Sequence, residues 1–561
     1  MTFAIQGVHT AAHLNLISRL LKELDLPEHV DQRVPVDPRC QTKPSDIVQV
    51  LVLDILSGRQ ALVHLASWAE GLDLDVLIRE GLRAKQLHDD TLARHLDRLA
   101  AAGIHELVAS FLCRLYQTEG LSARLLHGDT TSHSVYGRYE TASEEDLAIT
   151  YGYSRDRPGK KQFQYGLIAN EDGIPLLGDV HDGNLSDKTW NQRVPNGLSE
   201  AVQAVQLERS FLYVADSASM TGDTLRGFRQ VGAHVLTRAP SHLKVTKQAL
   251  KQGDAPGAIW SEPVTYAEYG GASYRFRETR DRFQDIPLRL LLVESSALDE
   301  RKTKTLQAKW KNEAEALKDL VRTASAKVYA CEPDAQAAGA ALVKRMKPAF
   351  HALEWAVTAI ERPIRRRGRP KQGVPPDRET IYALHVTVTP DDAAWEAARR
   401  RASRFVLATT LPEVWEGDAV SAETLLGWYK GQIQVEMNFS FLKDPQVTDE
   451  IYVKTPARVQ VLAYLFLLAL AVYRVLQRRL RQEITPERPM KGVGGRTLTR
   501  PTARAVFPLF RHVQVIVIRA PDGSVYRQLA KPLTKEQRRV LAGLGWQEDV
   551  YLGVTETGAP R

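Results

Sequence analysis

Cysteine is scarce in this chain of 561 residues. Its three cysteines, Cys40, Cys113 and Cys331, lie far apart in the sequence. That spacing excludes a disulfide framework and any Cys-x-x-Cys metal or redox motif. The N-terminal residues also lack the basic start, compact apolar stretch and small-residue cleavage site of a secretory signal. We therefore expect a protein of the reducing cytoplasm.

Long hydrophobic runs and nucleotide-binding motifs are missing as well. The longest apolar run, Val461 to Tyr473, is shorter than the roughly 17 to 25 residues that a membrane span needs, and it predicts a buried helix. The sequence holds no Gly-Lys-Ser/Thr phosphate loop, no internal repeat and no long low-complexity segment. We therefore expect neither a membrane partner nor a nucleotide cofactor.

The composition is that of an ordinary soluble globular chain, with 43% apolar and 25% charged residues. The length leaves room for several domains of roughly 100 to 200 residues each. A net charge of +8 permits a polyanionic partner, but the excess is modest for this length. Local clusters of basic residues therefore matter more than the total.

The hydrophobic period changes along the chain. Residues 1–119 show apolar spacing of three and four throughout, which predicts an all-α N-terminal domain. A short helix in it carries Arg94, His95 and Arg98 on a side that we expect to be exposed. A DNA-binding role and an ordinary helical bundle both remain open for this region.

After residue 120 the period approaches two, and short apolar runs alternate with turn residues. Three expected strands are followed by alternating helices and strands, which predicts an α/β core with a mixed sheet flanked by helices. The expected strands are Ala123–Thr131, Gln162–Ala169, Pro175–Val180, Phe211–Ala215 and Ala233–Thr237, and the expected helices are Asp187–Gln206 and Thr221–Gly232.

Four further divisions follow from the pattern. They are a first part of the core (120–240), a partly β insertion (241–395), a second part of the core (396–483) and a C-terminal strand and helix (484–561) that is a candidate dimerisation element. The insertion contains the densest basic run, 362–371, whose glycine and prolines predict a loop. Its Arg-Gly-Arg-Pro core resembles minor-groove AT-hook arms, and a solvated charged linker is the alternative. The arginines concerned are Arg365, Arg366, Arg367 and Arg369.

Asp129 stands just past the apolar part of the first expected strand, and Asp216 stands just past another expected strand. Ligands and catalytic groups collect at strand ends in open α/β sheets, so a metal site is one reading of this pair. Aspartates also form turns after strands, and that reading stays open. His127 and His133 share a strand face with Asp129; we expect them to pack or to orient it, with metal binding as the alternative.

A helix expected from Ser421 to Lys443 carries polar residues at spacings of three, four and seven, which return to one face. These residues are Tyr429, Gln432, Glu436 and Lys443. A second stripe, expected to pack into the core, consists of Leu426, Ile433, Met437 and Phe441. The polar stripe then points toward the sheet edge, unless it is simply the solvated side of an amphipathic helix.

The spacing of Tyr429, Glu436 and Lys443 resembles the Tyr-x-x-Arg-x-x-x-Glu-x-x-x-x-x-x-Lys signature of bacterial insertion-sequence transposases of the IS-four superfamily. In that family the Glu completes an Asp-Asp-Glu triad. From about residue 30 nearly to the C-terminus, further segments resemble one elongated subgroup, in order: HGDTTSHSVYG, GYSRDRPGKKQF, GNLSD, YVADSA, VLTRAP and VEMNFSFLKDP. The resemblance implies an RNase-H-like catalytic domain, interrupted by an insertion and preceded by a helical DNA-binding domain.

The resemblance implies that Asp129, Asp216 and Glu436 are the catalytic and metal-binding triad. Their hard oxygen ligands suit two Mg²⁺ or Mn²⁺ ions. Two such ions, about 3.5 to 4 Å apart, activate a water or a DNA 3′-hydroxyl and stabilise the leaving oxygen. The implied activity is cut-and-paste transposition: binding of terminal inverted repeats, cleavage, and joining of 3′-hydroxyl ends to target DNA. The implied assembly is a homodimer on DNA in the nucleoid.

Tyr429, Gln432 and Lys443 are expected to position the DNA backbone. Gln432 departs from the family pattern, which has an arginine there; glutamine can hydrogen-bond a phosphate but supplies no charge. Further expected DNA contacts are Arg155, Lys160, Lys161 and Arg238. Two alternatives stay open: an RNase-H-like nuclease without strand transfer, and an inactive DNA-binding derivative.

Overall fold

The computed structural model describes residues 4–553, except 141–145, 155–158, 206–209, 267–270, 298–299, 365–374, 449–450 and 452. The chain forms two compact units. The first unit comprises Met1–Arg238, Arg282–Leu288 and Ala408–Arg561, and the second comprises Ala239–Asp281 and Arg289–Leu407. All the triad residues expected from the sequence belong to the first unit. The assignment of functions to domains remains a prediction.

The first unit is built on a mixed sheet with the strand order β5-β4-β2-β6-β7. Strands β2, β4 and β5 are antiparallel neighbours, whereas β6 and β7 continue parallel to β2. The strands are β2 (Leu125–Ser134), β4 (Lys161–Asn170), β5 (Pro175–Asp182), β6 (Leu212–Ala215) and β7 (His234–Arg238), with the short β3 (Thr150–Tyr151) also on β4. All five expected strands are therefore present, and the predicted mixed sheet is confirmed.

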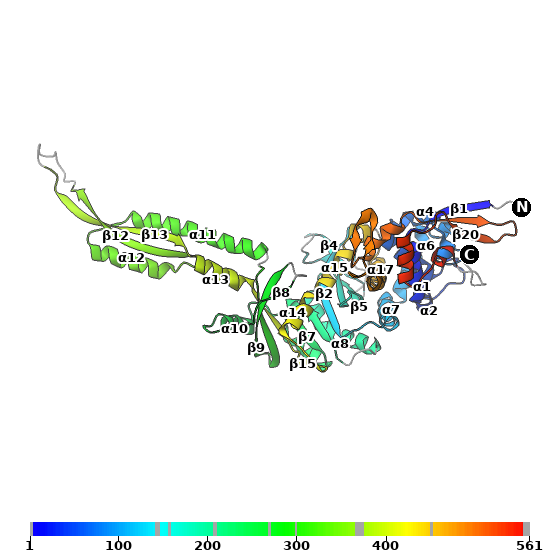
Figure 1. Cartoon of the computed structure of the whole chain (residues 1–561), viewed down its shortest axis with the longest axis horizontal. Helices are drawn as coiled ribbons and strands as arrows, with labels where there is room; N and C mark the ends of the chain where they lie inside the picture. The colour runs from blue at the N-terminus through cyan, green and yellow to red at the C-terminus, as the bar shows by residue number, and fades with distance from the viewer. Residues whose placement is uncertain are drawn as a thin grey trace. The chain divides into compact units, whose positions relative to one another are not determined.

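Helices cover both faces of this sheet (Figure 1). On β4, a Cβ atom at Gly166 would lie 2.3 Å from Trp190 of α8 (Asp187–Val205). The adjacent Tyr165 donates its hydroxyl to the Ala463 carbonyl of α17 (Pro456–Glu483) at 3.4 Å. Successive strand residues point to opposite faces, so α8 and α17 lie on opposite sides. The predicted flanking helices are confirmed, including α9 (Gly222–Gln230) between β6 and β7.

Helix α17 is the central core helix of the first unit. By length and composition alone its 28 residues could cross a membrane, and its most apolar 18-residue window has a mean hydropathy of 2.1. That window is 94% buried inside the protein. The apolar run Val461–Tyr473 thus forms the buried helix that its length predicts.

The N-terminal region is mostly helical but not entirely so. Strand β1 (Ala4–Thr10) pairs antiparallel with β19 (Gln514–Arg519), which pairs with β20 (Val525–Leu529). The prediction of an all-α domain at 1–119 is therefore not confirmed, because the partner of β1 lies at the other end of the chain. The helices of this region are α1 (Leu14–Glu23), α2 (Leu26–Arg33), α3 (Pro44–Ser57), α4 (Leu65–Glu70), α5 (Leu74–Leu77), α6 (Asp89–Ala101) and α7 (Ile104–Glu119).

The C-terminal part of the first unit supplies the remaining elements. They are β15 (Val414–Trp415), β16 (Asp418–Ala419), α14 (Ala422–Lys430), α15 (Ile433–Leu442), α16 (Pro445–Thr448), β17 (Met490–Lys491), β18 (Thr497–Leu498), α18 (Ala503–Val506), α19 (Lys535–Gly543) and α20 (Asp549–Leu552). The buried Asn15 side chain of α1 donates to the Val550 carbonyl of α20 at 2.7 Å. The two ends of the chain therefore pack together.

The second unit mixes strands with long helices. Strands β14 (Arg404–Thr409), β10 (Ile286–Ser295), β9 (Ala272–Phe283) and β8 (Val264–Tyr266) follow one another in a sheet. A long hairpin of β12 (His351–Pro363) and β13 (Arg378–Pro390) carries the short β11 (Val328–Tyr329). Its helices are α10 (Lys244–Gly253), α11 (Glu300–Ser325), α12 (Glu332–Met346) and α13 (Asp392–Ser403). Arg365, Arg366, Arg367 and Arg369 lie outside the described residues.

Candidate active site

Asp129 and Asp216 are brought side by side by strand register. The last parallel pair of β2 and β6 is Gly128 with Ala215, so the two aspartates are the next residues on neighbouring strands. Strand β7 continues the pattern, because Ala215 pairs with Thr237 and Arg238 comes next. Three adjacent parallel strands therefore deliver two carboxylates and a guanidinium to one end of the sheet.

The same strands place these side chains on the face opposite α8. A Cβ atom at Gly128 would lie 2.4 Å from the Tyr213 ring, whose hydroxyl donates to Asn191 of α8 at 2.9 Å. Gly128 thus faces α8, and Asp129, as the next residue, faces the other way. By the same alternation, Asp216 follows Ala215 onto the face covered by α14 and α15.

The helix expected over 421–443 is two helices, α14 and α15, with a break at Gly431 and Gln432. The backbone N–H of Gln432 donates to the Tyr429 carbonyl at 3.3 Å, three residues back, so the regular four-residue hydrogen-bond pattern of the helix is interrupted. A Cβ atom at Gly431 would lie 2.9 Å from the His127 ring. The glycine therefore lets the junction approach β2 closely, beside Asp129.

The break changes which residues face the core. Leu426 is buried as predicted, but Ile433 is 54% exposed and Met437 is 38% exposed, so the predicted apolar stripe is wrong beyond α14. Phe441 is half-buried against Tyr473, with 5.0 Å between ring centroids. The buried residues of α15 are instead Val435, Asn438, Phe439 and Leu442. The shortened turn rotates α15 relative to α14, which the sequence periodicity did not show.

Asp129 occupies an electrostatically strained position. The pKa of this half-buried carboxyl is raised to about 7, chiefly by burial and next by the neighbouring Asp216. Asp187 and Glu436 act in the same direction, whereas the Thr130 amide, donating at 2.8 Å, opposes the rise. A carboxylate surrounded by three others needs a proton or a cation to be stable.

Tyr429 joins this cluster from the end of α14. Burial raises the pKa of its hydroxyl, the Arg238 guanidinium lowers it, and Asp216, Glu436 and Asp129 raise it. The structure thus brings Tyr429, Arg238 and the three acidic residues into one electrostatic environment. Glu436 is exposed on α15. These five side chains come from the middle of β2, from the ends of β6 and β7, and from one helix pair, all far apart in the sequence.

Asp187 is a further acidic residue that the sequence reasoning did not single out. It is the first residue of α8, and the Thr130 hydroxyl donates to it at 2.5 Å. A sequence signal existed, because Asp187 ends the GNLSD segment that carries part of the family resemblance. Its approach to Asp129 depends on the turn from β5 to α8, which the local pattern does not determine.

The donor set suits a hard cation, although the acidic side chains do not form a compact cage. Across the part of the chain that the structure describes, no three His, Cys, Asp or Glu side chains are close enough to hold a metal ion as they stand. Asp216 caps a short 3₁₀ turn, accepting from the Ala218 amide at 2.9 Å. The raised pKa of Asp129 nevertheless marks negative charge that a divalent cation would neutralise.

The histidines near Asp129 pack rather than reach the cluster. His127 is 1% exposed, and burial lowers its pKa to about 4, so its ring is neutral. His133 lies against Phe163, with 5.2 Å between ring centroids. This is the packing role expected from the sequence.

Gln432 and Lys443, both expected to contact DNA, flank Glu436 on the helix pair. The side-chain amide of Gln432 donates to the Gly128 carbonyl at 3.5 Å, so this side chain lies against β2 next to Asp129. Lys443 is half-buried and caps the C-terminus of α15. The structure therefore places Gln432 as a contact between the helix break and the strand that carries Asp129.

The loop before β4 is only partly described. Lys161 donates from Nζ to the backbone carbonyls of Arg138 and Tyr139. Lys160 is exposed, with its ammonium 5.1 Å from the centre of the Tyr136 ring. Arg155 lies outside the described residues. Of the two lysines that the structure describes here, Lys160 is thus the one whose charge faces solvent.

Comparisons with known proteins give distant likenesses. Residues 6–112 match a family model described as a domain of unknown function, DUF4277. No curated protein matches. A piggyBac transposase synaptic complex with hairpin DNA is similar at 9% identity and a TM-score of 0.36, over 84% of this chain and 76% of that one. A Mos1 transposase paired-end complex is similar at 12% identity and a TM-score of 0.15, over 36% of this chain and 60% of that one.

Proposed function

We propose that this protein is a metal-dependent DNA transposase of the Asp-Asp-Glu type with an RNase-H-like core. The observation that carries the proposal is the register that puts Asp129 and Asp216 on adjacent parallel strands, beneath the helix pair that bears Glu436. The strand order β5-β4-β2-β6-β7 supports the RNase-H-like assignment. The family spacing of Tyr429, Glu436 and Lys443 supports membership in the IS-four superfamily.

Asp129, Asp216 and Glu436 would hold two Mg²⁺ or Mn²⁺ ions, which supply Lewis acidity to the attacking and leaving oxygens when bound. Asp129 would have to be ionised to hold a cation, and its pKa of about 7, raised by burial and by Asp216, would make metal binding weaker at low pH. Tyr429 and Arg238 stand at the same edge and would donate to the DNA backbone. Lys443, on the same helix as Glu436, would contact a neighbouring phosphate.

The proposed substrate is double-stranded DNA: the terminal inverted repeats of the protein's own insertion sequence, and a target. Cleavage exposes 3′-hydroxyls, and the same site joins them to target DNA. We propose a homodimer on the paired ends, with the region 484–561 as the dimerisation element, in the cytoplasm at the nucleoid.

A cleavage assay on a plasmid that carries the gene's own flanking DNA tests the proposal. Wild-type protein should produce metal-dependent breaks with 3′-hydroxyl ends at the element boundary, followed by joined products. Asp129→Asn and Glu436→Gln should each lose this activity while retaining DNA affinity. Glu423→Gln is the matched control, because Glu423 is exposed in the first turn of α14.

The outcomes separate the alternatives. Breaks without joined products would indicate a nuclease that lacks strand transfer. Binding without any breaks would indicate an inactive DNA-binding derivative. Full activity in Asp129→Asn or Glu436→Gln would exclude the triad.

A further inference from the structure

A strongly basic cavity lies in the helical part of the first unit, away from the triad. Its volume is about 370 Å³, and it opens between the segment 39–42, the turn 85–88 and helix α6. Four lining residues carry fixed positive charge, namely Arg39, Lys85, Arg94 and Arg98, and no lining residue is acidic. Such a concentration of one charge favours an anionic ligand.

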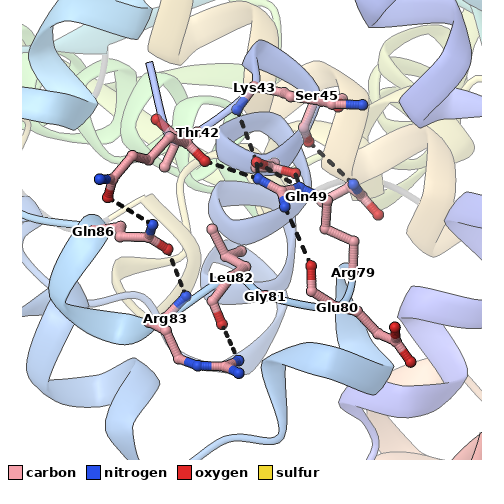
Figure 2. A network of polar contacts seen from close by, with 12 residues as sticks. Thr42, Lys43, Ser45, Gln49, Arg79, Glu80, Gly81, Leu82, Arg83 and Gln86 are labelled. Atoms are coloured by element: carbon pink, nitrogen blue, oxygen red, sulfur yellow. Dashed lines mark hydrogen bonds and ion pairs between the residues drawn. The ribbon is translucent and has the colours of Figure 1, made fainter. Parts of the chain in front are cut away.

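A polar network fixes the walls of this cavity before any ligand arrives (Figure 2). Arg79 holds the buried Asp46 carboxylate through two nitrogens, at 2.9 and 2.8 Å, and donates to the Gln41 carbonyl at 2.9 Å. The Gln86 amide donates to the Gln41 side chain at 2.9 Å and accepts from the Arg83 amide at 2.7 Å. Gln41 and Gln86 both line the cavity, so the two sides of its wall are tied together.

His95 provides an unsatisfied polar atom inside the cavity wall. The sequence predicts that it is exposed beside Arg94 and Arg98, but it is 1% exposed, and that prediction is wrong. Its Nε2 pairs with the Thr42 hydroxyl at 2.9 Å, and its Nδ1 is buried without a hydrogen-bond partner. Buried polar atoms without partners are rare, so the hydrogen bonding of this part of the cavity wall is incomplete.

The four cations divide into a pair that shares a carboxylate and a pair that does not. Arg39 and Arg98 share the Asp37 carboxylate, at 3.1 and 3.3 Å, and Arg98 also donates to the Cys40 sulfur at 3.3 Å. Lys85 and Arg94 are exposed, and the described structure pairs neither of them with a carboxylate. Lys85 and Arg94 can therefore bind an anion without breaking an existing ion pair.

We propose that this cavity binds a phosphate group, supplied by the backbone of DNA. Arginine and lysine together match the charge and geometry of a phosphate, and such contacts position a duplex without reading its bases. The DNA source rests on the proposed function; the binding of phosphate does not. The cavity would then fix the helical region on the inverted repeat while the triad acts elsewhere on the same DNA.

The first arm of the test measures binding of a fluorescently labelled mixed-sequence duplex by fluorescence anisotropy, in chelator, with the full chain carrying Asp129→Asn so that no DNA is cut. The test variant is Lys85→Gln with Arg94→Gln. The control, Arg33→Gln with Arg114→Gln, removes the same charge from helices α2 and α7 outside the cavity. The test variant should lower the slope of log affinity against log salt by about 1 to 2, and the control should leave it unchanged.

The second arm measures thermal unfolding in inorganic phosphate. Phosphate that binds the folded state raises the unfolding midpoint progressively as the phosphate concentration increases, and the test variant should lose that rise while the control keeps it. Loss in both arms supports DNA as the source. Loss in the phosphate arm alone supports phosphate binding but assigns the source to a free phosphate compound. No change in either arm overturns the proposal. If the wild-type chain binds no DNA, the proposed function fails, and the phosphate arm still decides the cavity.

Discussion

At the scale of single residues, Asp129 shows which features of the site are local in the sequence and which depend on tertiary structure. Its place after an apolar strand is visible in the sequence, and so is that of Asp216. Their adjacency is not visible, because it depends on a parallel pairing between strands about 85 residues apart, Leu125–Ser134 and Leu212–Ala215. The approach of Asp187 to Asp129 could not be predicted either, because it depends on the turn from β5 to α8. The residue types of the site could thus be predicted from the sequence, but the electrostatic interactions between those residues could not.

The raised pKa of Asp129 predicts how stability depends on pH. The carboxyl has a pKa of about 7 in the folded protein, against an ordinary value of 3.8, so the folded state holds the proton more tightly. Stability at this site is therefore highest below pH 3.8, falls as the pH rises, and reaches its full penalty above about pH 7. Asp129→Asn removes the penalty and should stabilise the metal-free protein at pH 8 by on the order of 2 to 4 kcal/mol.

Urea unfolding of both proteins across this pH range measures the difference. The two stability curves should converge toward pH 4 and separate as the pH rises. Excess Mg²⁺ at pH 8 should narrow the gap, because a bound cation neutralises the ionised carboxylate of the wild type. Glu423→Gln should run parallel to the wild type throughout. Parallel curves for Asp129→Asn as well would contradict the raised pKa.

At the scale of elements, the break between α14 and α15 decides where Glu436 lies. The sequence predicts one continuous helix, because the spacing of its polar residues looks regular across Gly431 and Gln432. A glycine inside a helical sequence pattern can have a packing or a functional reason, so the residue alone does not predict a break in the helix. Only the approach to His127 shows why this one is needed, and that contact joins residues about 300 positions apart. The strands were easier to predict, because their apolar runs are bounded by local turn residues.

Substitution of this glycine tests the close approach. In Gly431→Ala the added methyl group would lie 2.9 Å from the His127 ring and 3.1 Å from the Trp428 carbonyl. His127 is buried and cannot move aside, so we expect a loss of about 1 to 3 kcal/mol in unfolding free energy. The cleavage rate should fall too, because the helix pair is pushed away from Asp129. Urea denaturation and the cleavage assay measure the two effects.

Gly427→Ala on the same helix is the matched control. No atom lies within 4 Å of a Cβ at Gly427, so the added methyl group should be tolerated and should stabilise the helix by up to about 1 kcal/mol. Equal responses of the two variants would show that helix propensity, not contact with β2, governs this junction.

Asn438 anchors α15 from its buried side. Its side chain accepts from the buried Arg474 of α17 at 2.6 Å and donates to the Gly173 carbonyl at 2.9 Å. Asn438→Ala would leave the guanidinium with only a 3.5 Å contact to the Gln434 carbonyl, which should cost roughly 2 to 4 kcal/mol. Asn438→Asp keeps an acceptor for Arg474 and should lose less. Thermal unfolding compares the variants, and a larger loss in Asn438→Asp would contradict this role.

At the scale of the whole molecule, the first unit is closed by its two chain ends. Strand β1 pairs with β19, and the indole of Trp546 donates to Glu23 of α1 at 2.6 Å. The strand character of 513–520 could be predicted from its apolar alternation, but the segment before Ala11 carries no comparable signal. Its strand forms because a partner edge is available about 500 residues later. A strand pairing across so many residues cannot be predicted from a local sequence pattern.

One ion pair tests whether the two ends stabilise each other. Arg527 of β20 donates to Asp73 at 2.6 and 3.3 Å, and the exposed fractions of the two side chains are only 7% and 14%. Arg527→Met keeps much of the packing but leaves the Asp73 carboxylate without its partner, which should cost about 1 to 3 kcal/mol. Because α20 packs against both β20 and α1, the loss should spread beyond the substituted strand.

Hydrogen exchange followed by mass spectrometry separates a local effect from a shared one. In Arg527→Met, amide protection should fall both in β19–β20 and in α1, while the core strands β2 and β6 keep theirs. Arg538→Met is the control, because Arg538 is exposed on α19 and its loss should leave protection unchanged in all of these elements. If protection fell only around residue 527, the N-terminal helices would not depend on the C-terminal sheet, and the pairing of β1 with β19 would contribute little to the stability of the unit.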